Sequence, residues 1–251
     1  MLKGEKMVVA ATRQGVMLPN IGTLIIDEGD RFGYKNDQTP KYQTLDVALW
    51  RNRTHHTQLV IGGPSLTIAT KMLVDSGAKF IGHGPTTKII VITNMQHGPE
   101  PADLVVVPSK RDLGGYQWAT EVHTGHIADL EGSWPRAWLL GFDTLTSIPD
   151  VNQLEKVYLL LQRLRWLARE VYVYSQHPDH IILQEDFLDK ELANRKINDL
   201  PPYCRLIKIT KRDGSIEIRK MPRRTSASAF LKNIALERGD RVDIDPLSIL
   251  K

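Results

Sequence analysis

Short runs of apolar residues, bounded by turn-forming or charged residues, recur along the first two thirds of the chain. Runs of this length with such boundaries are typical of buried strands in a parallel sheet. The pattern predicts strands at residues 7–11, 23–26, 58–61, 88–93, 103–107, 136–141 and 171–174. Because helical segments separate several of these runs, the order indicates an α/β fold in which helices pack against a sheet.

Three segments have the spacing of helices. Residues 45–50 follow Thr44, a candidate helix cap, and lie between two predicted strands. Residues 151–169 repeat apolar side chains about every 3.6 residues, which predicts a helix with one buried face. Residues 181–197 predict an exposed amphipathic helix that stops before the Pro201-Pro202 pair, because the residue before a proline disfavours helical geometry.

The end of the chain combines a hairpin signal with an excess of positive charge. The Asp213-Gly214 pair, between apolar runs at 206–210 and 215–219, favours a tight turn between antiparallel strands. The basic residues of this region are Arg205, Lys208, Lys211, Arg212, Arg219, Lys220, Arg223 and Arg224, against only Asp213 and Glu217. Such an excess suits a phosphate backbone, because each neutralised phosphate releases counterions. A solvated basic face without a partner is the alternative interpretation.

Composition indicates an ordinary folded protein. Of the 251 residues, 41% are hydrophobic and 25% charged, and the net charge is +4. No run approaches the roughly 18 apolar residues of a membrane span, and residues 1–7 carry charges instead of an apolar signal region. We therefore expect a cytoplasmic protein without a membrane partner. The single cysteine, Cys204, excludes a zinc cluster made of several cysteines from this chain.

The apolar run Leu24-Ile25-Ile26 delivers two carboxylates, Asp27 and Glu28, at its C-terminal end. In folds that hydrolyse nucleoside triphosphates, this edge of a parallel sheet holds the nucleotide and its magnesium ion, so that one acid can hold the metal and the next can polarise water. Acids that end a buried strand also occur as simple solubilising turn residues, and the pattern alone does not separate the two.

Several blocks of sequence resemble the PriA family of replication-restart helicases, also called primosomal protein N-prime. Residues 7–19 are similar to its strand and GTR turn, and residues 21–35 to its LIIVDEEHDSSYKQ pattern. Residues 40–51 are similar to PRYHARDVAVWRA, and residues 61–66 to the GSATPSLE motif that couples nucleotide state to DNA. Near the end, residues 177–180, 201–206 and 241–250 resemble NPEHP, PPF-x-RL and RVDVDPVSLL. The middle, from about residue 71 to 133, matches poorly.

The resemblance implies remnants of two RecA-like helicase lobes with parallel sheets, followed by a small α+β C-terminal domain. Residues 1–70 would be the C-terminal part of lobe 1, residues 71–185 a degenerate lobe 2 and residues 186–251 a shortened C-terminal domain. Members of this family recognise stalled forks, unwind DNA in the 3′ to 5′ direction with ATP and help to reload the replicative helicase. The implied partners are forked or single-stranded DNA, single-strand-binding protein and other primosome proteins.

Departures from the family pattern bear on mechanism. The chain contains no G-x-x-x-x-G-K-[ST] loop to hold the phosphates of a nucleotide. Gly29 and Asp30 replace the second Glu and the His of the DEEH box, and the QVAGRAGR segment reads QRLRWLAR at residues 162–169. We therefore expect no autonomous ATPase or helicase activity. ATP and Mg²⁺ would be cofactors only if residual family activity is kept, and zinc is not expected, because the eight-cysteine site of the family is absent.

The resemblance also assigns candidate site residues. Asp27, Glu28 and Arg169 are the catalytic candidates, with Arg165 as an alternative arginine finger. The candidate nucleotide-coupling loop is Gly62, Gly63, Pro64 and Ser65. The candidate DNA contacts are Arg13, Arg205, Lys208, Lys211, Arg212, Arg219, Lys220, Arg223 and Arg224.

Two alternatives to a DNA-binding remnant stay open. The chain could be a fragment of an active ATP-dependent helicase whose phosphate-binding loop lies upstream. It could also be a non-enzymatic module that binds other replication proteins.

Other residue types allow weaker interpretations. The pairs His123/His126 and His177/His180 have metal-ligand spacing, but intervening glycine or proline favours ordinary surface or core histidines. Trp118, Trp134 and Trp138, near Arg136, could stack bases or fill a core.

Overall fold

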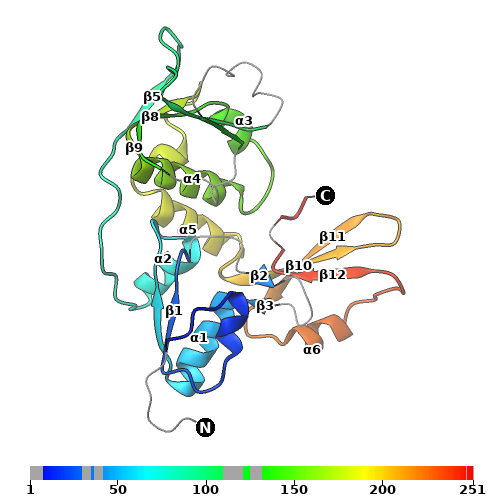
Figure 1. Ribbon diagram of the computed structural model, residues 1–251. Coiled ribbons are helices and arrows are strands. Elements are labelled where there is room, and N and C mark those ends of the chain that lie inside the picture. The colour runs from blue at the N-terminus through cyan, green and yellow to red at the C-terminus, as the bar shows by residue number, and fades with distance from the viewer. Residues whose placement is uncertain are drawn as a thin grey trace. The chain divides into compact units, whose positions relative to one another are not determined.

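The computed structural model describes residues 8–29, 35–36, 42–109, 121–124, 132–246 and 248–250, with no side chains described at 35–36 and 121–124. The chain divides into two compact units, Met1–Gly63 and Pro64–Lys251. Figure 1 shows the elements of both units, which are described one at a time below. The predicted domain boundaries at residues 70 and 185 stay predictions.

The first unit is built around a strand, helix, strand sequence. Its elements are η1 (Arg13–Met17), β1 (Thr23–Ile26), β2 (Lys35–Asn36), β3 (Tyr42–Gln43), α1 (Thr44–His55) and β4 (Gln58–Ile61). Strands β1 and β4 pair in parallel with Leu24 opposite Leu59, and α1 is the crossover between them. Ala48 of α1 packs on Ile26 of β1 and Val16 of η1, which gives this unit its core. The predicted strands at 23–26 and 58–61 and the helix between them are confirmed. The predicted cap is wrong, because Thr44 is the first residue of α1 and Gln43 is the N-cap.

The predicted strand at residues 7–11 is wrong for residues 8–11, which form no regular structure. Val8 is 99% exposed and Val9 53% exposed, so these apolar side chains are not buried. No described strand pairs with this segment. An apolar run forms a strand only where a neighbouring strand completes its backbone hydrogen bonds. Residue 7 lies outside the described residues.

The second unit contains a five-stranded parallel sheet with the strand order β5-β9-β8-β6-β7. These strands are β5 (Ile89–Ile92), β6 (Leu104–Val107), β7 (Glu121–Thr124), β8 (Trp134–Leu139) and β9 (Ala168–Tyr174). The helices of this unit are α2 (Ile68–Asp75), α3 (Phe142–Thr146), α4 (Gln153–Leu167), η5 (Ile181–Leu183), α5 (Phe187–Ile197) and α6 (Ala227–Lys232). The predicted strands near 88–93, 103–107, 136–141 and 171–174 are therefore confirmed, whereas β7 was not predicted.

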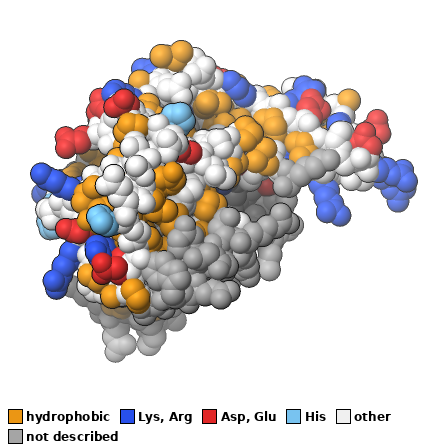
Figure 2. Space-filling model, turned by 90° about the horizontal axis from the view of Figure 1, so that it is seen from above, with side chains coloured by type: hydrophobic (Ala, Val, Ile, Leu, Met, Phe, Trp, Pro, Cys, Tyr) orange, Lys and Arg blue, Asp and Glu red, His pale blue; other side chains and the backbone are white. Residues whose placement is uncertain are grey.

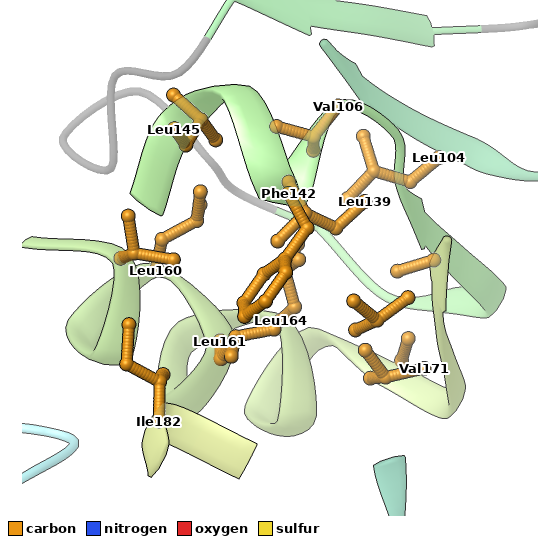
Figure 3. Close-up of a cluster of buried hydrophobic side chains, with 14 of the residues drawn as sticks. Leu104, Val106, Leu139, Phe142, Leu145, Leu160, Leu161, Leu164, Val171 and Ile182 are labelled. Atoms are coloured by element: carbon orange, nitrogen blue, oxygen red, sulfur yellow. The ribbon is translucent and has the colours of Figure 1, made fainter. Parts of the chain in front are cut away.

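Helix α4 supplies the main apolar face against this sheet. Leu160, Leu161 and Leu164 of α4 are fully or almost fully buried, and Figure 3 shows them around the ring of Phe142. Val171 of β9 closes the same cluster from the sheet side. Burial of each such side chain stabilises the fold by about 1.5–3 kcal/mol. The predicted helix at 151–169 is confirmed with slightly narrower bounds.

The predicted exposed helix at 181–197 needs correction. Residues 181–183 form a separate 3-10 turn, and α5 begins at Phe187. Helix α5 is not exposed along its length, because Glu191 and Arg195 are buried together with Phe187. Glu191 and Arg195 lie in an internal ionic network, whereas Asp189, Lys190 and Lys196 of the same helix are exposed.

A small antiparallel sheet follows, with the strand order β11-β10-β12. Its strands are β10 (Cys204–Thr210), β11 (Ile216–Pro222) and β12 (Arg241–Ile244). Gly214 has a φ of +83° in the turn between β10 and β11, which confirms the hairpin predicted from Asp213-Gly214. Ile207 and Ile209 of β10 pack with partly buried residues of α6. The chain is therefore a mixed α/β protein with a parallel sheet and a separate C-terminal antiparallel sheet, as predicted.

Candidate functional site

The carboxyl ends of β1 and β4 bring Asp27 and Gly62 together in the first unit. Gly62 N donates to Ile26 O at 2.8 Å, and Gly29 N donates to Gly62 O at 2.7 Å. A Cβ atom added at Gly62 would lie 3.6 Å from Asp27 Oδ1. Asp27 Oδ1 also accepts the N–H of Glu28 at 2.9 Å. Two of the predicted motifs, the acidic turn and the start of the coupling loop, therefore meet at one edge of a parallel sheet.

Packing explains why Gly29 departs from the family pattern. A Cβ atom at this position would lie 2.5 Å from Ile61 Cγ2, closer than two carbon atoms can approach. Glu28, with a φ of +47°, already places the turn in the left-handed region. A second glutamate could therefore stand at position 29 only if Ile61 moved. Asp30 lies outside the described residues.

The predicted coupling loop crosses the division of the chain, since Gly62 and Gly63 belong to the first unit and Pro64 and Ser65 to the second. In the second unit, Pro64 O accepts a hydrogen bond of 2.6 Å from Trp166 Nε1. Thr67 then caps helix α2. The second half of the loop is thus attached to α4 and α2.

The two candidate arginine fingers differ in their surroundings. Arg165 donates to Thr87 O at 2.6 Å, Pro85 O at 2.8 Å and Gln162 Oε1 at 3.1 Å, so its guanidinium holds a loop in place. Arg169 is exposed at the amino-terminal end of β9. It belongs to the second unit, whereas Asp27 and Glu28 belong to the first. The assignment of Asp27, Glu28 and Arg169 as catalytic stays a prediction.

The carboxyl edge of the five-stranded sheet carries a polar cluster that the sequence did not indicate as a group. Asp143, which follows β8, accepts from Ser175 Oγ at 2.5 Å and from Gln176 N at 2.9 Å. Partial burial acts to raise the pKa of Asp143, but these hydrogen bonds and the nearby His177 and His180 hold it below its usual value. The carboxylate therefore stays ionised and fixes the turn after β9.

His180 lies at the same edge of the sheet and stabilises the segment that follows β9. Burial lowers the pKa of His180, although Asp143 opposes the shift. His180 Nδ1 accepts the N–H of Ile182 at 3.3 Å, so the ring is unprotonated at that nitrogen and caps η5. Among the described residues, no three or more His, Cys, Asp and Glu side chains are placed to hold a metal ion. The side chain of His123 and the whole of His126 lie outside that part of the chain.

Carboxylates neutralise part of the predicted C-terminal DNA contact. Arg205 pairs with Asp245 at 2.7 Å, Lys211 with Asp240 at 3.1 Å and Arg219 with Glu217 at 2.5 Å. Lys208, Lys220 and Arg223 donate to backbone carbonyl groups. Arg212 and Arg224 are exposed. At the right of Figure 2, where the antiparallel sheet extends, Lys and Arg side chains stand beside Asp and Glu.

These basic residues do not share one face of the sheet. Arg205 and Arg219 lie opposite Met221 and Ile207, on the face that packs against α6. Lys208 and Lys220 alternate with them along β10 and β11 and therefore lie on the other face. Arg13 lies in η1 of the first unit. A single basic surface is thus not formed by these strands, and DNA binding by these residues stays a prediction.

The tryptophans near Arg136 are largely structural. Trp138 is buried, stacks on Tyr172 at a centroid distance of 4.4 Å and donates from Nε1 to Asp103 Oδ2 at 2.9 Å. Its ring is therefore not available to a base, and the core interpretation holds for this residue. Trp134 is half-buried, and Trp118 lies outside the described residues. An exposed tryptophan, Trp166, was not considered from the sequence.

The class defined by this geometry is a parallel α/β protein whose acidic turn and glycine loop meet at the carboxyl edge of a sheet. Over 92 residues, the chain is 30% identical to the replication restart protein PriA of Helicobacter pylori. The match covers 35% of this chain and 15% of that protein, so the activity, substrates and partners of the whole relative are proposals here. No family model matches the chain. Among the described residues, no helix is long and apolar enough to cross a membrane.

Proposed function

We propose that this chain is a PriA-like primosomal protein that acts in DNA replication restart by binding forked or single-stranded DNA. The observation that carries the proposal is the similarity to the replication restart protein PriA over 92 residues. The proposed site of residual magnesium binding is Asp27 and Glu28, and the proposed DNA contacts include Arg212 and Arg224. Its proposed partners besides DNA are single-strand-binding protein and other primosome proteins.

The proposal excludes autonomous ATP hydrolysis by the chain alone. The local geometry supports an inherited sheet edge, because Asp27 faces Gly62 where the two motifs of the family would meet. The printed sequence lacks the glycine-rich lysine loop that would grip the β- and γ-phosphates. A carboxylate pair without that loop can hold a divalent cation but has no means to position the phosphate that would be cleaved.

Two measurements on the full chain test this function. Fluorescence anisotropy with a labelled fork should show binding whose affinity falls as salt rises, because phosphate contacts release counterions. Steady-state ATPase assays, with and without the fork, should show no turnover above buffer. Absence of any DNA binding would overturn the proposal. A DNA-stimulated ATPase rate that disappears in Asp27→Asn would instead identify an active motor.

A further inference from the structure

Large apolar side chains are exposed on the loop before β5 and on the last turn of α4. Trp166 is 43% exposed, Phe80 52% and Ile81 81%. The loop, residues 77–88, runs from α2 to β5. Exposure of several large side chains on neighbouring segments marks an interaction site more often than single exposed residues do.

The exposed indole is held in a fixed position. Trp166 Nε1 donates to Pro64 O at 2.6 Å, and its ring lies 5.7 Å from the ring of His83, centroid to centroid. The loop is anchored beside it, because Arg165 donates to Pro85 O and Thr87 O. Thr87 Oγ1 also donates to the first residue of β9, Ala168 O, at 3.0 Å. Trp166 and His83 therefore form a preorganised pair of rings.

Space remains next to this pair. Gly82 and Gly84 flank His83, and a Cβ atom added at either one would meet no atom within 4 Å. Gly82 has a φ of +131°, which only glycine adopts readily. The backbone on both sides of His83 is thus uncovered, and a flat ligand or a phosphate can approach it closely.

The two segments carry one sign of charge. Residues 77–88 contain Lys79 and Lys88, and residues 162–169 contain Arg163, Arg165 and Arg169, with no Asp or Glu in either range. This differs from the C-terminal sheet, where carboxylates pair with several of the cations. We name the exposed residues Lys79, Phe80, His83, Lys88, Trp166 and Arg169 the aromatic-basic patch.

We infer that the aromatic-basic patch is a binding site for single-stranded nucleic acid, with bases stacked on Trp166 and Phe80 and phosphates beside Lys79 and Lys88. Aromatic rings combined with cations are the recognition chemistry of unpaired strands, whose bases have free faces. Duplex DNA offers no such faces. A protein partner is less well matched, because lysine is depleted in protein interfaces. The inference shares with the proposed function the assumption that the ligand is a nucleic acid.

The test uses the full chain and fluorescein-labelled oligothymidylate of about 20 nucleotides, which exceeds the usual site size. Trp166→Leu should weaken binding by roughly 5- to 150-fold, the range for loss of one base–aromatic stack. Trp166→Phe keeps a ring but loses the hydrogen bond to Pro64 O, so it should stay within about threefold of the wild type. The matched control is Trp50→Leu, since Trp50 is 54% exposed but lies in the first unit.

A salt series adds a second readout. Lys79→Gln should reduce the slope of log affinity against log salt by about 0.7, the contribution of one phosphate contact on a single strand. If Trp166→Leu binds the oligonucleotide like the wild type, the inference is overturned while fork binding can still support the proposed function. If Trp166→Phe is as weak as Trp166→Leu, the hydrogen bond and not the ring matters, which also overturns it. Failure of the wild type to bind either DNA would overturn both proposals.

Discussion

Arg195 of α5 is the centre of a buried ionic network in the second unit. Its guanidinium is paired with Glu191 at 2.8 Å and with Glu155 of α4 at 3.2 Å. It also donates to Val151 O at 3.0 Å and Pro201 O at 3.1 Å. All three charged side chains are buried. One cation thus joins α4, α5 and the segment that leads into β10.

Replacement of this cation, in Arg195→Met, should be strongly destabilising. Removal of one partner from a buried ion pair costs about 3–5 kcal/mol, because the remaining charge is left without compensation. We therefore expect the free energy of unfolding, measured by urea denaturation with circular dichroism, to fall by about that amount. The control is Lys190→Met on the same helix, whose pair with Asp186 at 3.0 Å is exposed. That change should cost less than about 1 kcal/mol.

The pH dependence of this loss of stability tests whether the uncompensated charge of Glu155 causes it. Burial is the largest influence on Glu155 and raises the pKa of its carboxyl, although Arg195 and the N–H of Ile68 oppose it. Without Arg195, this pKa rises further above the unfolded value of about 4.3. A folded state that binds the proton more tightly than the unfolded state loses stability as pH rises between the two pKa values. The destabilisation should therefore be largest near neutral pH and shrink on acidification. A loss below about 1 kcal/mol at neutral pH, or one that grows in acid, would refute the reasoning.

Three further changes are predicted to have local effects. Gly29→Ala should lower the free energy of unfolding by about 1–3 kcal/mol, because the added methyl group overpacks against Ile61. In a double-mutant cycle of urea denaturation, Gly29→Ala should be less harmful when Ile61→Ala is also present. Trp138→Phe should cost about 1–3 kcal/mol, since buried Asp103 loses a donor, and thermal denaturation should show a lower melting temperature. At pH values above the usual aspartate pKa, Asp143→Asn should lower the free energy of unfolding by about 1–2 kcal/mol. Because the folded-state pKa of this carboxyl is lowered, that difference should disappear as pH falls through it, which a series of urea titrations from neutral to strongly acidic buffer would measure.

Local sequence patterns were sufficient to predict much of the fold. The repeat of apolar side chains in α4 predicted its buried face, and the Asp213-Gly214 pair predicted the turn of the C-terminal hairpin. Both signals depend on residues close in sequence, so no tertiary information is needed. The strand predicted at residues 8–11 was wrong because strand formation depends on a neighbour, which the apolar run itself does not encode.

Charge and exposure were harder to predict because they depend on contacts distant in sequence. Glu191 and Arg195 have the spacing of a solvated surface pair, yet both are buried, and Arg195 also pairs with Glu155 at a separation of more than thirty residues. Trp166 is a different case, because it lies two residues after buried Leu164 and therefore off the buried face of α4. The helical spacing indicates its exposure, whereas its contact with His83 depends on a loop distant in sequence.

The same dependence on distant partners changes what the basic C-terminal segment implies for nucleic-acid binding. Of its eight cations, Arg205, Lys211 and Arg219 are paired with carboxylates, two of which, Asp245 and Asp240, lie far beyond the segment itself. A paired cation contributes little to counterion release, because it already has a counter-charge that a phosphate would have to displace. The remaining cations are spread over both faces of the sheet and its turns. They can supply general attraction to a phosphate backbone, whereas the fixed ring of Trp166 can distinguish unpaired bases from a duplex.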